Sequence, residues 1–386
     1  MTARRYEFLD LRGVNAPYME ELVAAAERVV RGGRYVGGEE VERLEASLRQ
    51  VCGVPYAVAV SNGLDALRLI LRGYVELGRM RPGDEVIVPA NTYIASVLAV
   101  RDAGLVPVLA DVDPLTSNIA GGDALEALIT PRTAAVMPVH LYGRVAWDAS
   151  LADIAERHNL IVVEDNAQAI GAVSPVAGLH GSCVTGGLGH AAGMSFYPTK
   201  NIGALGDAGA VTTHDGELAA VVRALANYGA PKRYDNVYEG FNCRMDPLQA
   251  AMLQVKLAHL REENDDRRAR AALYRSAINN GAVALPADAG EAHVYHQFVV
   301  HVADRPAFCS WLDANGVGWD IHYAVPPHRQ RCYAEGGVVV PAGGLPVTER
   351  LAATCVSLPI TRCTSPADAG EIAEIINGYR PGQGVL

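Results

Sequence analysis

The chain has 386 residues, of which 50% are hydrophobic, and its formal net charge is −10. A chain of this length and composition can bury a substantial core in two compact domains. The acidic balance and the shortness of the basic runs argue against a surface that binds nucleic acid or an anionic membrane.

Seven cysteines are scattered along the chain without a CxxC pair or a metal-like spacing. This usage is typical of a reducing compartment, where thiols stay free. The first residues lack the apolar core of a signal peptide, and no stretch approaches the ~20 apolar residues that cross a membrane. We therefore expect a cytoplasmic protein.

Residues 1–20 show little periodicity and are expected to form an arm, with a short strand at residues 9–11. A helix is predicted over residues 19–30, because two glycines follow it. A glycine turn that contains Tyr35 then leads into an amphipathic helix through residues 41–51. This turn is either a plain helix entry or a contact to a ligand.

A buried strand is predicted at residues 56–60, and Ser61-Asn62-Gly63-Leu64 turns from it into a helix. The N-terminus of a helix carries unpaired N–H groups and the positive end of the helix dipole, which suit a phosphate. An ordinary capped helix is the alternative at this point.

Further strands are predicted at residues 84–89, 106–111, 134–140, 160–165 and 191–196, with helical stretches such as 94–103 between them. Their continuous apolar runs indicate a parallel sheet that is covered on both faces. Ligands of such sheets bind at the carboxyl ends of the strands. Five side chains follow strands at that end: Asn91, Tyr93, His140, Asp165 and Lys200.

The large unit is expected to include residues 1–255, with the arm. One long charged helix is predicted over residues 252–275, and the domain boundary is placed on it. Residues 256–386 then form a small α+β domain, with a strand at 296–302 and a closing helix at 367–379.

Lys200 lies between the strand at 191–196 and a glycine-rich run. A lysine whose surroundings lower its pKa can form a Schiff base with an aldehyde, which is the chemistry of pyridoxal phosphate. Asp165 ends an apolar strand, where an ionised carboxylate needs a cation such as a protonated pyridine nitrogen. Considered separately, each residue has another interpretation. Lys200 could be a solvated lysine on a loop, and Asp165 could cap a helix.

Other residues complete a cofactor site of this kind. Gln168 can reach the ring hydroxyl if its stretch turns helically, and Tyr93 can lie flat against the ring or belong to the core. The Ser195 hydroxyl and the amides of Gly63 and Leu64 are expected to hold the phosphate.

The chain contains, in order, Ser61-Asn62-Gly63-Leu64-Asp65-Ala66-Leu67, Pro89-Ala90-Asn91-Thr92-Tyr93, Glu164-Asp165-Asn166-Ala167-Gln168, Ser195-Phe196-Tyr197-Pro198-Thr199-Lys200 and Gly240-Phe241-Asn242-Cys243-Arg244-Met245-Asp246. With these five motifs it resembles the DegT/DnrJ/EryC1/StrS family of sugar aminotransferases. The likeness covers nearly the whole chain. Some members carry histidine in place of the lysine and act as dehydratases, so Lys200 favours transamination.

The resemblance implies the α/β architecture of fold-type I pyridoxal phosphate aminotransferases, with a mainly parallel sheet in the large domain and a smaller α+β C-terminal domain. It also implies a homodimer with its active sites at the subunit interface. By resemblance, Lys200 binds the cofactor aldehyde, Asp165 the pyridine nitrogen and Gln168 the ring hydroxyl. Asn242 is expected to reach the phosphate of the neighbouring subunit's cofactor. Many members have threonine where this chain has Leu64. Leucine keeps the backbone contact to the phosphate but cannot make the contact that a threonine hydroxyl would make.

Tyr197 stands where members that aminate C4 usually have histidine. The run at 201–210 resembles the branch that aminates C3 of dTDP-3-oxo-6-deoxyhexoses. In that branch a His-Tyr pair approaches the sugar, here His322 and Tyr323. Lys232, as a contact from the partner subunit, and Tyr35 complete the substrate-binding candidates. A surface lysine and a core histidine remain the alternatives for Lys232 and His322.

The expected reaction transfers an amino group from L-glutamate and gives dTDP-3-amino-3,6-dideoxyhexose and 2-oxoglutarate, with pyridoxamine phosphate formed between the two half-reactions. One alternative is C3 amination of a UDP-linked 3-oxo uronic acid sugar, whose carboxylate Arg233, Arg244 or Arg329 can bind. Another is C4 amination of a dTDP-4-oxo-6-deoxyhexose. A regulator that borrows the fold should add a basic helix-turn-helix segment, which this acidic chain lacks.

Overall fold

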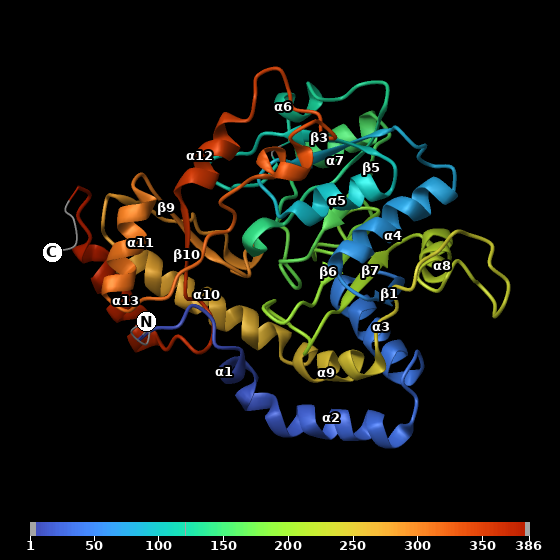
Figure 1. The fold of residues 1–386 in the computed structure, drawn as a ribbon, viewed down its shortest axis with the longest axis horizontal. Helices are drawn as coiled ribbons and strands as arrows, with labels where there is room; N and C mark the ends of the chain where they lie inside the picture. Colours follow the sequence, from blue (N-terminus) through green and yellow to red (C-terminus); the bar gives the residue numbers. More distant parts are fainter. Residues whose placement is uncertain (1–4, 120, 383–386) are drawn as a thin grey trace.

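The computed structural model describes residues 5–119 and 121–382. Within these ranges seven strands form one sheet in the order β1-β7-β6-β5-β4-β2-β3, and three form a second sheet in the order β10-β9-β8 (Figure 1). The first sheet contains β1 (Tyr56–Val60), β2 (Glu85–Pro89), β3 (Val106–Ala110), β4 (Thr133–Val136), β5 (Ile161–Asp165), β6 (Ala191–Ser195) and β7 (Gly209–Thr213). The second contains β8 (Val283–Ala284), β9 (Phe298–Val302) and β10 (Cys355–Leu358).

The first sheet is mainly parallel, as predicted. The pairs β2 with β3, β2 with β4, β4 with β5 and β5 with β6 are all parallel. Within this sheet, as far as the chain is described, only β7 runs against its neighbours, β1 and β6. The sequence pattern did not predict β7, because its residues continue the glycine-rich run after Lys200.

The helices of the described chain are α1 (Leu11–Asn15), α2 (Met19–Gly32), α3 (Glu39–Cys52), α4 (Gly63–Glu76), α5 (Ile94–Asp102), α6 (Asp123–Glu126), α7 (Ala149–Arg157), α8 (Gly216–Leu225), α9 (Pro247–Leu257), α10 (Leu260–Ala277), α11 (Arg305–Ala314), α12 (Pro346–Thr354) and α13 (Pro366–Gly378). Short 3₁₀ turns lie at Ala16–Tyr18, Leu141–Gly143, Gly290–Ala292, Pro327–Arg329 and Arg331–Tyr333. The helices predicted at residues 19–30, 41–51 and 94–103 are confirmed as α2, α3 and α5.

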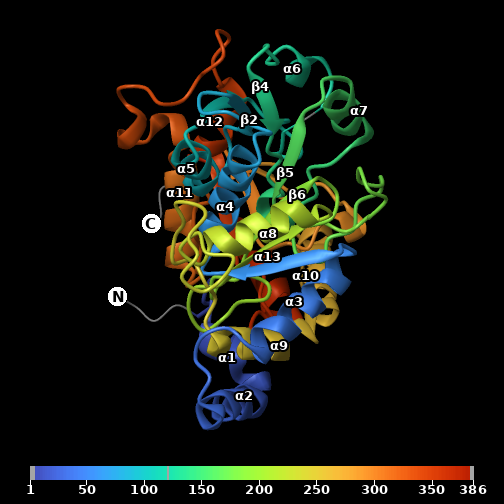
Figure 2. The ribbon, with the colours of Figure 1, turned by 90° about the vertical axis from the view of Figure 1, so that its right-hand side faces the viewer.

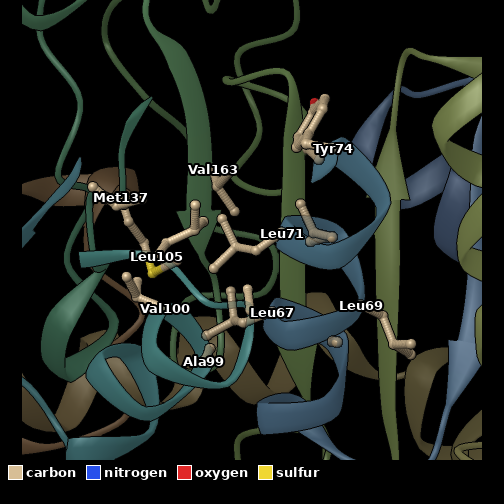
Figure 3. Close-up of a cluster of buried hydrophobic side chains, with 14 of the residues drawn as sticks. Leu67, Leu69, Leu71, Tyr74, Ala99, Val100, Leu105, Met137 and Val163 are labelled. Atoms are coloured by element: carbon tan, nitrogen blue, oxygen red, sulfur yellow. The ribbon is translucent and has the colours of Figure 1, made fainter. Parts of the chain in front are cut away.

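Helices cover both faces of the large sheet. On one face α4 packs against β6 and β7 and against α5 and α8, while α3 and α9 cover the other face near β1. Figure 3 shows Leu67, Leu71 and Tyr74 of α4 beside Val100 and Val163 in the first of these cores. Burial of each leucine of this kind stabilises the folded chain by roughly 1.5–3 kcal/mol. This packing fixes the N-terminus of α4 at the carboxyl end of the sheet.

The second sheet has its own core. Phe298, Phe308 and Tyr274 are buried there, and further side chains come from α10, α11, α13, the strands and the segments between them. The N-terminal arm returns to this core, because Tyr6 is buried in it and its N–H donates to the Gly316 carbonyl at 3.0 Å. In the described part of the chain, no helix has the length and apolar character that a membrane span requires.

Two sequence predictions are wrong. Residues 9–11 form no strand, because the Asp10 side chain accepts a hydrogen bond from the Gly13 N–H at 2.9 Å and caps α1. The helix predicted over 252–275 is two helices, α9 and α10, which lie end to end in Figure 1 and are separated at Ala258 and His259. Neither residue is a glycine or proline, so the sequence carries no signal for the break. The predicted domain boundary at residue 255 falls inside α9.

Candidate active site

A cavity of about 500 Å³ opens at the carboxyl ends of β5 and β6. It is lined by the first residues of α4, by the segment that leads into α5, and by the residues that follow β5 and β6. Residues of the smaller unit close it from the other side: His296 and Gln297, which precede β9, and His322 and Tyr323, which follow α11. The parallel sheet therefore places its ligand cavity where such sheets usually do.

Lys200 lies in a turn directly after β6, where its N–H donates to the Tyr197 carbonyl at 2.8 Å. The side chain is half-buried and lines the cavity. Burial lowers the pKa of Lys200 to about 8, while the Asp165 carboxylate acts in the opposite direction. A substantial fraction of this amine is thus neutral near pH 8, as a nucleophile requires.

Asp165 is the last residue of β5 and is buried at the cavity. Its carboxylate accepts hydrogen bonds from the Ser96 hydroxyl at 2.7 Å and from the Ala167 N–H at 3.1 Å. Burial raises the pKa of Asp165, and these two hydrogen bonds and the charge of Lys200 oppose that rise. A cationic group placed against this carboxylate would offset the cost of its burial.

Gln168 lies in a turn that follows β5, and its amide orientation is determined by its neighbours. Its Oε1 accepts the backbone N–H of Tyr142 at 2.6 Å, and its Nε2 donates to the Tyr323 hydroxyl at 3.0 Å. A backbone N–H only donates, so the atom that faces it is the oxygen. The NH₂ group of Gln168 therefore points into the cavity.

The N-terminus of α4 forms a cradle for an anion beside Ser195. Asn62 caps this helix by accepting the Asp65 N–H at 2.8 Å, and the amides of Gly63 and Leu64 precede the first intrahelical hydrogen bond. A Cβ atom on Gly63 would lie 2.6 Å from Cβ of Ser195. Only glycine permits this approach, which brings a hydroxyl and the positive end of a helix dipole together.

The loop that carries Lys200 is held from below by residues that the sequence analysis missed. The buried Lys256 donates from Nζ to the Gly203 carbonyl at 2.7 Å, and burial lowers the pKa of Lys256 to about 8. Asn201 donates from Nδ2 to Oδ1 of Asn264 at 2.9 Å and to the Val294 carbonyl at 3.0 Å. A lysine on an otherwise apolar face of α9 was the available signal for Lys256.

The side of the cavity opposite the sheet is formed by aromatic and polar groups. The Tyr93 and Tyr323 rings lie 5.3 Å apart, and Nδ1 of His322 lies 2.7 Å from the Ser357 hydroxyl. His296 and Gln297 line the same wall, although the sequence analysis did not select them. A histidine that precedes an apolar strand resembles a core residue, so their position depends on the tertiary structure.

Several predicted residues do not line this cavity within the same chain. Tyr197 lines it and is half exposed, whereas Tyr35, Lys232 and Asn242 are exposed on loops outside it. Asn91 and His140 are buried behind it instead. Three arginines also lie outside, on the surface: Arg233, Arg244 and Arg329.

The hydrogen bonds of His140 give it a structural role. Its Nδ1 accepts the Ala146 N–H at 2.9 Å, so the hydrogen is on Nε2, which donates to Glu164 at 2.8 Å. Glu164 also accepts the backbone N–H groups of Gly186, Leu188 and Gly189. This buried network anchors the end of β5 behind Asp165.

Solved structures share this fold. The structure of DesV from S. venezuelae in complex with a ketimine intermediate is 41% identical to this chain, with a TM-score of 0.90, and covers 97% of this chain and 98% of DesV. NtdA from Bacillus subtilis with bound cofactor PMP is 30% identical, with a TM-score of 0.86, and covers 97% of this chain and 85% of NtdA. The chain thus has the architecture of the fold-type I pyridoxal phosphate aminotransferases.

Sequence comparisons agree with the structural ones. The chain is 45% identical over 375 residues to the dTDP-3-amino-3,6-dideoxy-alpha-D-galactopyranose transaminase of Aneurinibacillus thermoaerophilus, which covers 96% of this chain and 99% of the relative. The model of the DegT/DnrJ/EryC1/StrS aminotransferase family matches residues 18–377. The chain belongs to the DegT/DnrJ/EryC1/StrS aminotransferase family.

Proposed function

We propose that this chain is a pyridoxal phosphate-dependent aminotransferase that moves an amino group from L-glutamate to C3 of a dTDP-3-oxo-6-deoxyhexose. The products are dTDP-3-amino-3,6-dideoxyhexose and 2-oxoglutarate. The observation that carries the proposal is the meeting of Lys200, Asp165, Gln168 and the N-terminus of α4 at one cavity. The similarity to the A. thermoaerophilus transaminase supports the choice of sugar.

The cavity suits the cofactor in two respects. The buried Asp165 carboxylate calls for a cation, which a protonated pyridine nitrogen supplies. The Gly63 and Leu64 amides with the Ser195 hydroxyl suit a phosphate group. When bound there, pyridoxal phosphate supplies an aldehyde that exchanges amines and a ring that withdraws electrons.

The side chains divide the work of catalysis between them. With the cofactor bound, Lys200 would hold its aldehyde group, and the neutral amine, once displaced by glutamate, would take a proton from Cα of the substrate and return it to the cofactor carbon that bore the aldehyde. Asp165 stays ionised to keep the ring nitrogen protonated, and Gln168 donates its free N–H to the ring oxygen. Both substrates use the same cavity in turn, so ping-pong kinetics are expected.

The part of the cavity that one chain lines favours a 6-deoxy sugar over a uronate. Leu64, Ile94 and Leu98 form an apolar wall, and no arginine lies among the lining residues in the described part of the chain. A uronate carboxylate needs a cation nearby. Arg329, one of the arginines considered for that role, instead pairs with Glu349 on the surface.

A homodimer completes the proposal. Lys232 and Asn242 are exposed outside the cavity of their own chain, as expected of residues that act on a neighbouring subunit, and Tyr35 is exposed there as well. Apolar side chains are also exposed on α2, which projects at the lower edge of the molecule in Figure 2: Met19, Val23 and Val30. Sedimentation analysis tests this assembly, and a monomer that retains full activity would contradict it.

A cytoplasmic location belongs to the same proposal. Each of the seven cysteines lies within the described ranges and is a free thiol. Free thiols are typical of proteins in a reducing compartment.

The substrate is tested with a panel of 3-oxo and 4-oxo nucleotide sugars, each incubated with L-glutamate and followed by mass spectrometry. We expect transfer to the dTDP-linked 3-oxo-6-deoxyhexose, with nitrogen on C3 in the NMR spectrum of the product. Nitrogen on C4 would contradict the assignment made from Tyr197. Preference for a UDP-linked 3-oxo uronate would contradict the argument from the apolar wall.

A further inference from the structure

Tyr142 has a backbone conformation that a bulky residue rarely adopts. Its φ is 59° and its ψ is 7°, in the left-handed region, and its side chain is buried. A conformation of this kind persists only where the surroundings determine it, and such residues cluster at functional sites. The contacts of Tyr142 show what this conformation achieves.

The backbone N–H of Tyr142 points at Gln168. It donates to Oε1 at 2.6 Å, which leaves Nε2 of Gln168 to donate to the Tyr323 hydroxyl. Without this donor, the oxygen and the NH₂ group of the amide could exchange places. The left-handed corner thus determines which group Gln168 presents to the cavity.

The carbonyl groups of the same corner hold the opposite wall of the cavity. The Tyr142 carbonyl accepts the Gln297 N–H at 3.2 Å, and the Gly143 carbonyl accepts the Val294 N–H at 2.9 Å. Gly143 also has a positive φ of 92°, and a Cβ there would lie 2.8 Å from the His296 nitrogen. Residues 294–297 therefore rest directly on this corner.

The side chain of Tyr142 reaches a third segment. Its hydroxyl donates to the His322 carbonyl, and Asn91 is its other polar neighbour. Burial raises the pKa of Tyr142 well above its usual value, so the phenol stays protonated and remains a donor. One residue thus contacts the cofactor side through Gln168 and the sugar side through Gln297 and His322.

We propose that Tyr142 is a positioning residue that fixes His322 and Tyr323 against the sugar nucleotide while it orients Gln168 toward the cofactor. This inference rests on the proposed function. The backbone of Tyr142 serves the cofactor side, and its hydroxyl serves the sugar side. The two roles can be separated by substitution, because Tyr142→Phe removes only the hydroxyl.

In ping-pong kinetics, kcat/KM for each substrate reports its own half-reaction. We expect Tyr142→Phe to lower kcat/KM for the 3-oxo sugar nucleotide by about three- to tenfold, the usual effect of one lost hydrogen bond. The value for glutamate and the visible absorbance spectrum of the loaded enzyme should not change. Calorimetry should show the same weakening for binding of the aminated sugar nucleotide.

Tyr274→Phe is the matched control, because this buried hydroxyl also donates to a backbone carbonyl, that of Pro359 at 2.8 Å, and neither residue lines the cavity. It should lower the melting temperature and leave both kcat/KM values unchanged. Tyr142→Gly tests the backbone, since glycine adopts the same φ without strain and keeps the N–H. Its absorbance spectrum should match that of the parent enzyme.

Unchanged sugar kinetics in Tyr142→Phe would overturn the role of the hydroxyl. Equal losses in both half-reactions, or the same loss in Tyr274→Phe, would show a merely structural role. A changed spectrum in a folded Tyr142→Gly variant would overturn the backbone role. A parent enzyme that shows no absorbance change with glutamate would contradict the proposed function instead, and calorimetry would still test Tyr142.

Discussion

The two sides of the cavity differ in how completely one chain builds them. On the cofactor side, Asp165 and Gln168 are only 5% and 8% exposed, and each has hydrogen-bond partners that hold it. On the proposed sugar side, Tyr197 lines the cavity and is 52% exposed, and Tyr35, on a loop outside the cavity of its own chain, is 58% exposed. A rigid sheet edge fixes the group that must be positioned most accurately, whereas loops and a second subunit can adapt to a variable sugar.

The largest effect is expected at the centre of the cofactor side. Replacing Lys200 with alanine removes the amine that links the aldehyde and carries the proton, so multiple-turnover transfer should fall by about three orders of magnitude or more. Steady-state assays with glutamate and the oxo sugar measure this. An enzyme that still turned over repeatedly would show that Lys200 is not the nucleophile.

Asp165→Asn keeps the shape of the side chain but removes the charge that pairs with the ring nitrogen. We expect the rate to fall by about a hundredfold or more, while the cofactor still binds. Single-turnover absorbance with glutamate separates the rate from binding. If the rate stayed the same, Asp165 would have no electrostatic role.

Gly63→Ala tests the anion cradle on the cofactor side. The added methyl group would lie 2.6 Å from Cβ of Ser195, so the helix and the strand must separate. The dissociation constant for pyridoxal phosphate, measured by absorbance titration, should rise about tenfold. Gly281→Ala is the control, since no heavy atom lies within 4 Å of its Cβ position. Equal affinities in both variants would argue against the cradle.

Lys232→Ala tests the sugar side. Loss of this exposed lysine should raise KM for the sugar nucleotide by about three- to tenfold, because a solvated charge contact contributes on the order of 1 kcal/mol to binding. The glutamate half-reaction should not change. Arg261→Ala removes a charge of the same sign from an exposed position on α10 and serves as the control. A lower kcat/KM for glutamate in Lys232→Ala would contradict the division of the cavity into a cofactor side and a sugar side.

The last effect, on stability instead of activity, is expected beneath the Lys200 loop. The pKa of Lys256 is lowered to about 8 in the folded chain, so the unfolded chain binds more protons between this value and the usual 10.5. Its charge therefore destabilises the fold below pH 8, and the penalty disappears as the pH rises toward 10.5. A shift from 10.5 to about 8 corresponds to a penalty of about 3 kcal/mol.

Lys256→Met removes this group. The melting temperature of the variant minus that of the parent chain should be greatest at pH 7. This difference should fall by a few degrees as the pH rises toward 10. Thermal unfolding of the two cofactor-free chains across this range provides the measurement. A difference that does not depend on pH would mean that Lys256 titrates normally.

Much of the cofactor side could be predicted because its residues end apolar strands. β5 and β6 are continuous buried runs, so the positions of Asp165 and Lys200 at one sheet edge follow from the sequence pattern. Gln168 could be predicted because it comes three residues after Asp165. The helix start at Gly63 could be predicted from the Ser-Asn-Gly turn that follows a buried strand. The mainly parallel sheet was predictable for the same reason.

The rest depends on contacts between distant segments. The corner at Tyr142 has a left-handed conformation in a bulky residue, which no local propensity indicates. The backbone of Val294 and Gln297, on either side of His296, is hydrogen-bonded to that corner, and this contact between distant segments helps to place His296 and Gln297 at the cavity. The break between α9 and α10 lacks a glycine or proline, and its His259 ring packs against Tyr18 at 4.8 Å. Packing therefore decides these features.

The most direct test uses the fact that the chain has only three lysines: Lys200, Lys232 and Lys256. The chain loaded with pyridoxal phosphate is treated with borohydride, digested and mapped by mass spectrometry, which locates the reduced cofactor on one lysine. We predict that the label lies on Lys200 and that the visible absorbance band disappears on reduction. A label on Lys256 or Lys232, or a chain that takes up no cofactor and stays colourless, would contradict the account.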